Sequence, residues 1–408
     1  MNNIELLAPA GSIEKLKIAI DYGADSVYIG GKNFSLRNAA SNFDFDEMKK
    51  AVDYAHAKDK KVYLAANIIP HNEEIKNYPE FIKNSAATGI DAVIVSDLGI
   101  FEMTKEFIPK LDIHISTQAN NVNWLSCKKW YQMGAKRIIL ARELHLDEIK
   151  EIRENTPIEL ELETFVHGAM CISYSGRCLL SKYMVNRNSN LGDCAQPCRW
   201  KYYLMEENRP GDFFGLVGST NGSYVMNSKD LCMINHIDSL IKAGVFSLKI
   251  EGRMKSEYYV STVVKTYKEA INVFLKNPDG FKIDKSWMEE LEKISNREYT
   301  TGFYFKKPDL NSQNYKSGSY VRKYDLIGIV KVYDKDTKIA SIILKNKLCM
   351  GDKLEVFTQK DKFFTQKVYF MENSEGEKIE VASVAQNIVK IKIDKNVNER
   401  AIIRKLRH

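Results

Sequence analysis

The chain has 408 residues, 44% of them hydrophobic and 28% charged, so it can bury at least one full-sized core and is not a disordered chain. Its 60 basic and 53 acidic residues leave a net charge of only +7, which excludes the strongly basic, histone-like binders. We find no apolar run long enough to span a bilayer, no signal peptide and too few cysteines for a secreted disulfide scaffold, and therefore expect a cytoplasmic protein without a membrane span.

The first two thirds of the chain alternate short β-branched segments with longer amphipathic ones, a pattern typical of parallel strands joined by crossover helices. Helices are expected at Ser12–Tyr22, which opens with an N-cap serine, and at Phe45–Lys58, which follows Asp44. Eight strands are expected, at Ile4–Ala8, Ser26–Gly30, Val62–Ala66, Ala92–Ser96, Asp112–Ser116, Arg137–Ala141, Glu159–Phe165 and Ser247–Glu251. Eight such units predict an α/β fold, a (β/α)₈ TIM-like barrel over residues 1–276.

The connection between the seventh and the eighth strand, at about residues 166–245, is much longer than the others. It leaves the carboxyl end of a barrel strand, the face where TIM-barrel active sites form. Because long loops inside a compact domain are usually functional, this insertion predicts the position of the site.

A polar connector at 277–319 ends the strand and helix alternation, and residues 320–408 are expected to form a small antiparallel β-barrel. Its six expected strands are Leu326–Tyr333, Lys338–Leu344, Lys353–Phe357, Phe363–Met371, Lys378–Ala382 and Ile388–Ile393.

This last part of the chain carries the excess of positive charge. From Val321 to His408 there are 19 basic and 12 acidic residues. Aromatic side chains are interleaved with basic ones, namely Lys331, Lys335, Lys338, Lys345, Lys347, Lys353, Lys390, Lys392, Arg404, Lys405 and Arg407. The combination suits backbone contact and base stacking on RNA, although a solvated lysine-rich surface explains the composition equally well.

Five of the seven cysteines fall in the insertion: Cys171, Cys178, Cys194, Cys198 and Cys232. Four thiolates are enough for a tetrahedral zinc site or a four-iron cluster, and their unequal spacing in a long loop suits a cluster better than a zinc ribbon. A set of buried structural thiols is the less favoured interpretation, because such cysteines rarely concentrate in one segment.

Six polar residues at strand exits are expected to point into the mouth of the barrel: Asn67, Gln118, Arg142, His167, Glu251 and Arg253. Arg142 and Arg253 suit a dicarboxylate, since a guanidinium binds a carboxylate with two parallel hydrogen bonds, although each could equally be a salt-bridge partner. Asn67 and Gln118 are further candidate substrate contacts, and His167 and Glu251 are the candidate catalytic groups.

Two longer segments resemble the signature of the collagenase-like peptidase family, whose catalytic type was never settled. They are Glu163–Cys171 (ETFVHGAMC) and Gly176–Ser181 (GRCLLS), and Leu6–Gly11, Asn190–Arg199, Asn227–Cys232 and Lys249–Met254 resemble the same family. The resemblance implies a barrel with an oxygen-sensitive [4Fe-4S] cluster. In the branch of this length it also implies O₂-independent synthesis of 5-hydroxyuridine at the tRNA wobble position, with prephenate as the required metabolite.

Within that family the fourth cluster ligand corresponds to either Cys198 or Cys232, and this chain has both; the compact spacing favours Cys198. The implied partners are tRNA and a small dicarboxylate metabolite, with a related subunit of the same family as a further candidate.

Two other functions stay open at this point. One is a peptidase, in which Cys171 and His167 would form the nucleophile and base pair. The other is a non-catalytic RNA-binding scaffold with a structural metal, in which zinc is the alternative to iron.

Overall fold

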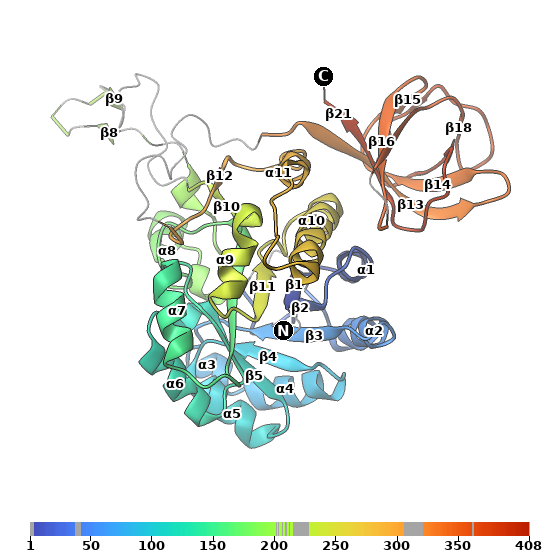
Figure 1. Cartoon of the computed structure of the whole chain (residues 1–408). Helices are drawn as coiled ribbons and strands as arrows, with labels where there is room; N and C mark the ends of the chain where they lie inside the picture. The colour runs from blue at the N-terminus through green and yellow to red at the C-terminus, as the bar shows by residue number, and fades with distance from the viewer. Residues whose placement is uncertain are drawn as a thin grey trace.

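The structure is a computed structural model that describes residues 4–36, 42–200, 228–305, 321–360 and 363–407, with 202, 204, 205, 207, 208, 210, 211, 213 and 214. It confirms the expected barrel (Figure 1). The eight parallel strands are β1 (Glu5–Pro9), β2 (Ser26–Gly30), β3 (Lys61–Ala66), β4 (Ala92–Val95), β5 (Asp112–Ile115), β6 (Arg137–Ile139), β7 (Glu161–Ala169) and β11 (Ser247–Ile250). The barrel is closed because β11 pairs with both β1 and β7.

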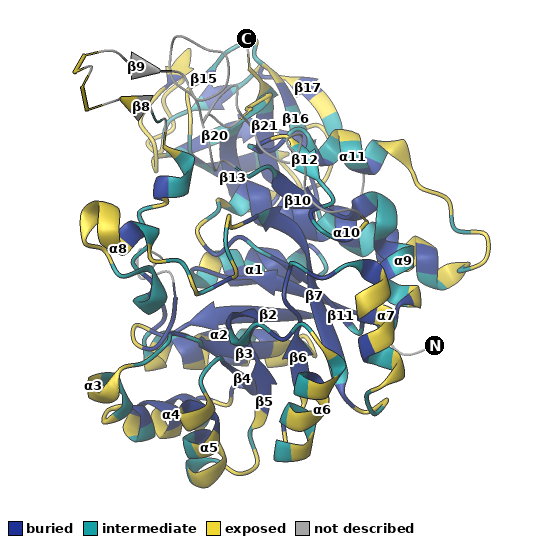
Figure 2. Ribbon diagram, turned by 90° about the vertical axis from the view of Figure 1, so that its left-hand side faces the viewer, coloured by how far each residue is buried: buried dark blue, intermediate teal, exposed yellow. Residues whose placement is uncertain are grey.

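Helices cover the outside of the barrel, with buried faces toward the strands and exposed faces toward solvent (Figure 2). They are α1 (Ile13–Asp21), α2 (Phe45–His56), α3 (Asn72–Ile75), α4 (Tyr78–Ala87), α5 (Leu98–Phe107), α6 (Trp124–Met133), α7 (Leu146–Glu154), α9 (Ile237–Lys242) and α10 (Glu257–Lys276). The expected helix starts are confirmed: Ser12 accepts from the Lys15 amide, and Asp44 forms a capping box with Glu47.

The barrel interior holds a buried ion network. Arg137 Nη1 on β6 donates to Glu5 Oε1 at 2.6 Å and to Glu163 Oε2 at 2.9 Å, and Lys249 Nζ on β11 donates to Glu163 Oε1 at 2.8 Å. Two cations thus balance two buried carboxylates, as burial of charge requires. His114 on β5 is 2% exposed. Burial and then the charge of Arg137 hold the pKa of His114 well below its ordinary value.

The insertion and the connector both extend the barrel. Strand β10 (Asp230–Cys232) pairs antiparallel with the end of β7, and β12 (Tyr299–Thr300) pairs with β10. The expected connector therefore contains structure, including helix α11 (Lys285–Leu291). Part of it, residues 306–320, lies outside the described chain.

The tail domain, residues 321–407, is a seven-stranded antiparallel sheet curled into a half-barrel, in the order β17-β16-β21-β13-β14-β20-β18. Its strands are β13 (Tyr324–Asp334), β14 (Ile339–Leu344), β16 (Lys353–Phe357), β17 (Phe364–Lys367), β18 (Met371–Glu372), β20 (Ile388–Lys392) and β21 (Ile402–Leu406), and β15 (Leu348–Cys349) pairs separately with β19 (Val381–Ala382). The sequence missed β21, although it lies in the middle of the sheet, between β16 and β13.

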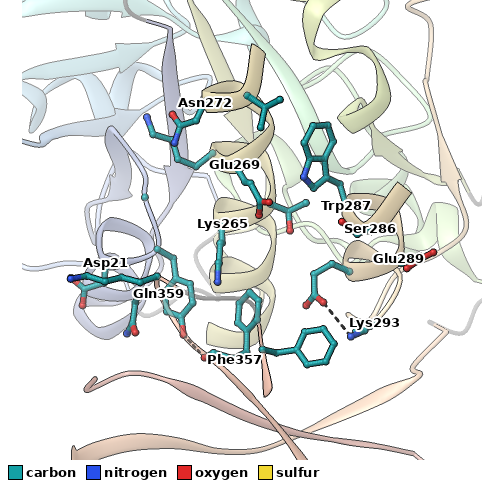
Figure 3. A pocket seen from close by; sticks show the side chains of 18 of the residues that line it. Asp21, Lys265, Glu269, Asn272, Ser286, Trp287, Glu289, Lys293, Phe357 and Gln359 are labelled. Carbon is teal, nitrogen blue, oxygen red and sulfur yellow. Dashed lines mark hydrogen bonds and ion pairs between the residues drawn. The ribbon is translucent and has the colours of Figure 1, made fainter. Parts of the chain in front are cut away.

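The tail domain packs against α10 and α11 through a buried ion network. Arg404 on β21 is fully buried, with Nη2 3.0 Å from Glu290 Oε2 and 2.7 Å from Glu355 Oε2. It therefore cannot contact RNA, which corrects its inclusion among the candidate RNA-binding cations. A cavity of about 530 Å³ remains at this junction, with Lys265 and Trp287 on the barrel side and Phe357 on the tail side (Figure 3). None of the described helices is long and apolar enough to cross a membrane.

Candidate active site at the mouth of the barrel

The carboxyl ends of the barrel strands and the start of the insertion enclose the mouth cavity, a hollow of about 120 Å³. We call residues 170–200, which follow β7, the cysteine loop; it contains the short helix α8 (Leu180–Val185). Five of the six expected mouth residues line this cavity: Asn67, Gln118, Arg142, Glu251 and Arg253. His167 does not.

Arg142 follows β6 and joins the end of β7 to the cysteine loop. Its Nη1 donates to the Ala169 carbonyl at 2.8 Å, and its Nη2 donates to Ser175 Oγ at 2.5 Å and to Cys171 Sγ at 3.4 Å. The guanidinium also lies over the Phe165 ring, 5.2 Å from the centroid. These contacts use both terminal nitrogens of Arg142. We therefore interpret Arg142 as a residue that positions the loop, and not as the group that binds a ligand carboxylate with two parallel hydrogen bonds.

Arg253 is the second cation of the mouth and is 4% exposed. Its Nη1 donates to Ser35 Oγ at 2.7 Å. A Cβ at Gly30, the last residue of β2, would lie 1.8 Å from that same nitrogen, so only glycine leaves room for the guanidinium there. The end of β2 is thus shaped to hold a positive charge over the cavity.

Two amide side chains, those of Asn67 and Gln118, form another part of the wall of the mouth cavity. Asn67, after β3, donates from Nδ2 to Gln118 Oε1 at 2.6 Å, and Ser116 Oγ donates to the same oxygen at 2.5 Å. Gln118 lies in a 3₁₀ turn directly after β5. These bonds hold both amides in fixed orientations, as a binding surface for polar groups requires.

Glu251, directly after β11, is the acid of the mouth. Its Oε2 accepts from Tyr28 Oη at 3.3 Å, and its carbonyl accepts from Tyr259 Oη on α10 at 2.8 Å. Gly168 makes this packing possible, since it has a φ of +113° and a Cβ there would lie 2.5 Å from the Glu251 carbonyl oxygen. Tyr28 on β2 therefore helps to orient Glu251.

Four of the five insertion cysteines gather at the mouth. Cys171, Cys178 and Cys194 line the cavity. Burial raises the pKa of the Cys198 thiol, the charge of Arg199 lowers it, and the charges of these three cysteines raise it further, so Cys198 lies within their electrostatic reach. As the side chains stand, no three His, Cys, Asp or Glu residues in the described ranges are placed to hold one metal ion together. The donor set itself, four unbridged thiols beside one cavity, fits an iron–sulfur cluster.

Cys232 lies apart from that group. It is on β10, opposite His167 of β7 in the strand register, and its Sγ is 3.8 Å from Tyr267 Oη on α10. The side chain is 5% exposed, and burial raises the pKa of the thiol to about 11. Of the two candidates for a fourth ligand, the structure therefore places Cys198 and not Cys232 with the other three.

His167 does not have the expected placement. The register of β7 against β11 runs from Phe165 opposite Lys249 to His167 opposite Ile250, so a bulge at Val166 reverses the alternation of side chains. The His167 ring lies among tyrosines, its Nδ1 3.4 Å from Tyr267 Oη, and burial lowers its pKa to about 3. The Cys171–His167 pair that a cysteine peptidase needs is therefore not formed.

The sequence missed several residues of the site, above all Lys249 and Ser175, which line the cavity, and Ser35, which accepts a hydrogen bond from Arg253. The Lys249 Nζ lies 4.6 Å from the Tyr28 ring centroid. Its position two residues before Glu251 on one strand was a usable signal, because alternate residues share a face. Ser35 and Ser175 stand in loops, and no spacing rule points to them.

A closed TIM barrel whose catalytic face carries clustered thiols and two buried arginines defines an enzyme-type barrel. Two family models cover nearly the whole chain: Peptidase family U32 matches residues 11–314, and the Peptidase family U32 C-terminal domain matches residues 322–404. The chain belongs to peptidase family U32, as its signature segments indicated.

Three relatives show the range of names in this family. The chain is 39% identical to tRNA hydroxylation protein P1 of Bacillus subtilis, over 98% of this chain and 94% of that protein. It is 38% identical to tRNA hydroxylation protein P of Escherichia coli, over 93% and 91%. It is 44% identical to an uncharacterized protease of Methanocaldococcus jannaschii, over 86% and 85%.

Proposed function

We propose that this protein is a tRNA-modifying enzyme that acts in tRNA hydroxylation. One observation carries the proposal: three of the cysteines line one cavity together with Arg253 and Glu251 at the catalytic face of the barrel, and Cys198 interacts electrostatically with all three. Relatives that are named for tRNA hydroxylation align with 98% and 93% of this chain, so the match includes both the barrel and the tail domain. A tRNA substrate also implies a cytoplasmic protein.

The cofactor we propose is a [4Fe-4S] cluster held by Cys171, Cys178, Cys194 and Cys198. When bound, such a cluster supplies electron transfer or a Lewis-acidic iron beside the cavity. The chain's own contribution is to hold the loop: Arg142 ties Cys171 to the end of β7, and the amide of Gln196 donates to Cys194 Sγ at 3.4 Å.

The reaction we propose is conversion of the wobble uridine to 5-hydroxyuridine without O₂, with prephenate as co-substrate. Replacing the C5 hydrogen by a hydroxyl group from water releases two electrons and two protons. An acceptor for these electrons is needed, and we assign that role to the dicarboxylate co-substrate or its products. Arg253 is the group we assign to its carboxylate, because Arg142 already uses its terminal nitrogens on the loop.

The test compares cells that lack this chain with cells that carry it or the Cys171→Ser variant. We expect hydroxyuridine in bulk tRNA only with the parent chain, and iron and sulfide near four per chain in anaerobically purified parent protein but not in the variant. A matched control is Cys349→Ser. Cys349 lies in the tail domain, so this variant should change neither the hydroxyuridine level nor the iron and sulfide content. Unchanged hydroxyuridine in cells without the chain would refute the function.

The same experiment separates the alternatives. A scaffold with a structural metal would bind tRNA and metal while leaving hydroxyuridine unchanged. A peptidase would cleave a gelatin or casein substrate in a manner that depends on Cys171 and not on iron.

A further inference from the structure

A second hollow lies beside the mouth, between the barrel and the tail domain. This interdomain cleft has a volume of about 500 Å³. Its walls come from three separate parts of the chain: Arg199 from the cysteine loop, Met254 and Lys255 from the loop between β11 and α10, and Arg322 and Tyr324 from the start of the tail domain. The Arg404 network fixes the two domains against each other, so the cleft has a defined shape.

The cleft and the mouth cavity share a wall, because Glu251 lines both. Their sizes differ. The mouth cavity, at about 120 Å³, is smaller than the ~300 Å³ of pockets that enclose a whole small ligand, whereas the cleft lies within that range. A substrate with its reacting ring in the mouth would therefore extend into the cleft.

Positive charge faces the cleft from both sides. In the described part of the chain, neither Arg199 nor Arg322 has an acidic partner within salt-bridge distance, and Arg322 is exposed. Lys255, between them, lies over the Tyr259 ring at 5.2 Å from the centroid. The acidic Asp325 is 4.0 Å from Arg407, so part of its charge is already compensated. Guanidinium groups contributed to the cleft by two separate parts of the chain fit the phosphates of a strand bound in it.

An apolar side chain also lines the same cleft. Met254 of the lining is 48% exposed, and Trp200, which follows Arg199 in the chain, is 38% exposed. Large apolar side chains beside cations are the combination that binds single-stranded nucleic acid, since bases stack on the first and phosphates contact the second.

We propose that the interdomain cleft binds the sugar–phosphate strand of single-stranded RNA that flanks a base inserted into the mouth cavity. The proposal rests on the proposed function and adds how the substrate is presented: the target nucleotide is turned out of its stack, and its neighbours lie between Arg199 and Arg322. An unpaired loop is the favoured target, because turning a base out of a paired strand costs unpairing energy as well as unstacking energy.

The test measures binding of an unmodified tRNA transcript at several salt concentrations. Arg322→Gln and Arg199→Gln are each expected to weaken binding roughly ten-fold and to reduce the slope of log affinity against log salt by about one. The matched control is Lys128→Gln, an exposed cation of α6 outside the cleft, which should bind within two-fold of the parent. Iron content equal to that of the parent shows that Arg199→Gln has not disturbed the neighbouring Cys198.

A second measurement locates the strand directly. A transcript with 4-thiouridine beside the target position should cross-link to peptides that contain residues 196–200, 252–256 or 322–326. Parent-like binding by both arginine variants, with cross-links elsewhere, would overturn this inference and leave the proposed function standing. No binding of tRNA by the parent would overturn both. Parent-like tRNA affinity combined with loss of a co-purifying protein would make the cleft a protein-docking site and would also overturn the inference.

Discussion

Arg404→Ala should separate the tail domain from the barrel more than any other single change. Its guanidinium is fully buried and contacts both Glu290 on α11 and Glu355 on β16, and its Nη1 is 3.3 Å from Tyr258 Oη. Lys293 is the other cation of the network, with Nζ 3.2 Å from Glu290 and 3.1 Å from Glu355. Without Arg404, two largely buried carboxylates would share one ammonium group.

The magnitude follows from that imbalance. Removal of one partner of a buried, hydrogen-bonded ion pair costs about 3 to 5 kcal/mol, because the remaining charge is left buried. For a domain of the size of the tail, each kcal/mol lowers the melting temperature by about 4 to 8 °C, so its transition should fall by roughly 12 °C or more.

The same variant should also change the pH dependence of stability. Burial alone would raise the pKa of Glu290, but the hydrogen bond and charge of Arg404 lower it. A carboxylate with a lowered folded pKa stabilises the parent above its unfolded pKa, and that contribution is lost as the pH falls.

Scanning calorimetry of the whole chain at neutral and at acidic pH measures both effects. The control is Arg407→Ala on the same stretch of chain, where an exposed arginine lies 4.0 Å from Asp325 and the expected loss is below about 1 kcal/mol. If Arg404→Ala lowers the melting temperature no more than Arg407→Ala does, the buried network does not hold the domains together. The inference that the interdomain cleft has a fixed shape would then be wrong. Arg404→Met with Glu290→Gln should recover most of the loss, since it leaves Lys293 paired with Glu355 and no charge unpaired.

The other predictions concern the site. Because burial lowers the pKa of His167 to about 3 in the folded chain, the unfolded state binds this proton first as the pH falls below about 6.5, and His167 should cost about 1.4 kcal/mol of stability per pH unit, beside the contribution of the buried His114. His167→Phe should remove the His167 contribution and leave a shallower drop in acid denaturation curves while tRNA hydroxyuridine persists. Cys198→Ala should lose iron in an anaerobic assay, and Cys232→Ala should retain it; the reverse result would make Cys232 the fourth ligand. Arg253→Lys should retain iron but lower hydroxyuridine roughly ten-fold, with partial rescue by excess prephenate, since it keeps the charge and loses the two-pronged contact; an unchanged level would assign Arg253 to bracing the wall.

Sequence periodicity was sufficient for the barrel because parallel strands buried on both faces are continuous apolar runs between helices. It was insufficient for β21. Arg404 and Lys405 interrupt that strand's apolar pattern, and Arg404 can be buried only because Glu290, far away in the chain, is placed opposite it. A strand whose burial depends on a distant counter-charge has no local signal.

The same contrast holds at the site. Arg142, Glu251 and Arg253 could be found because they follow barrel strands, and strand ends meet at one face. The placement of His167 could not be found, since a single bulge at Val166 reverses the direction of its side chain and no local sequence feature announces the bulge. The choice between Cys198 and Cys232 likewise needed the fold, because both spacings are compatible with a long loop.

The two domains and the mouth are connected through consecutive residues of α10. Tyr258 faces the tail domain, where its Oη lies 3.3 Å from Arg404 Nη1, and Tyr259 faces the barrel, where its Oη donates to the Glu251 carbonyl at 2.8 Å. A helix that moved with the tail domain would therefore displace the backbone that carries the mouth acid. Since Glu251 also forms the wall shared by the mouth cavity and the interdomain cleft, docking of the tail domain sets the geometry of both hollows at once. This arrangement explains why a buried arginine at the domain junction bears on chemistry at the carboxyl face of the barrel.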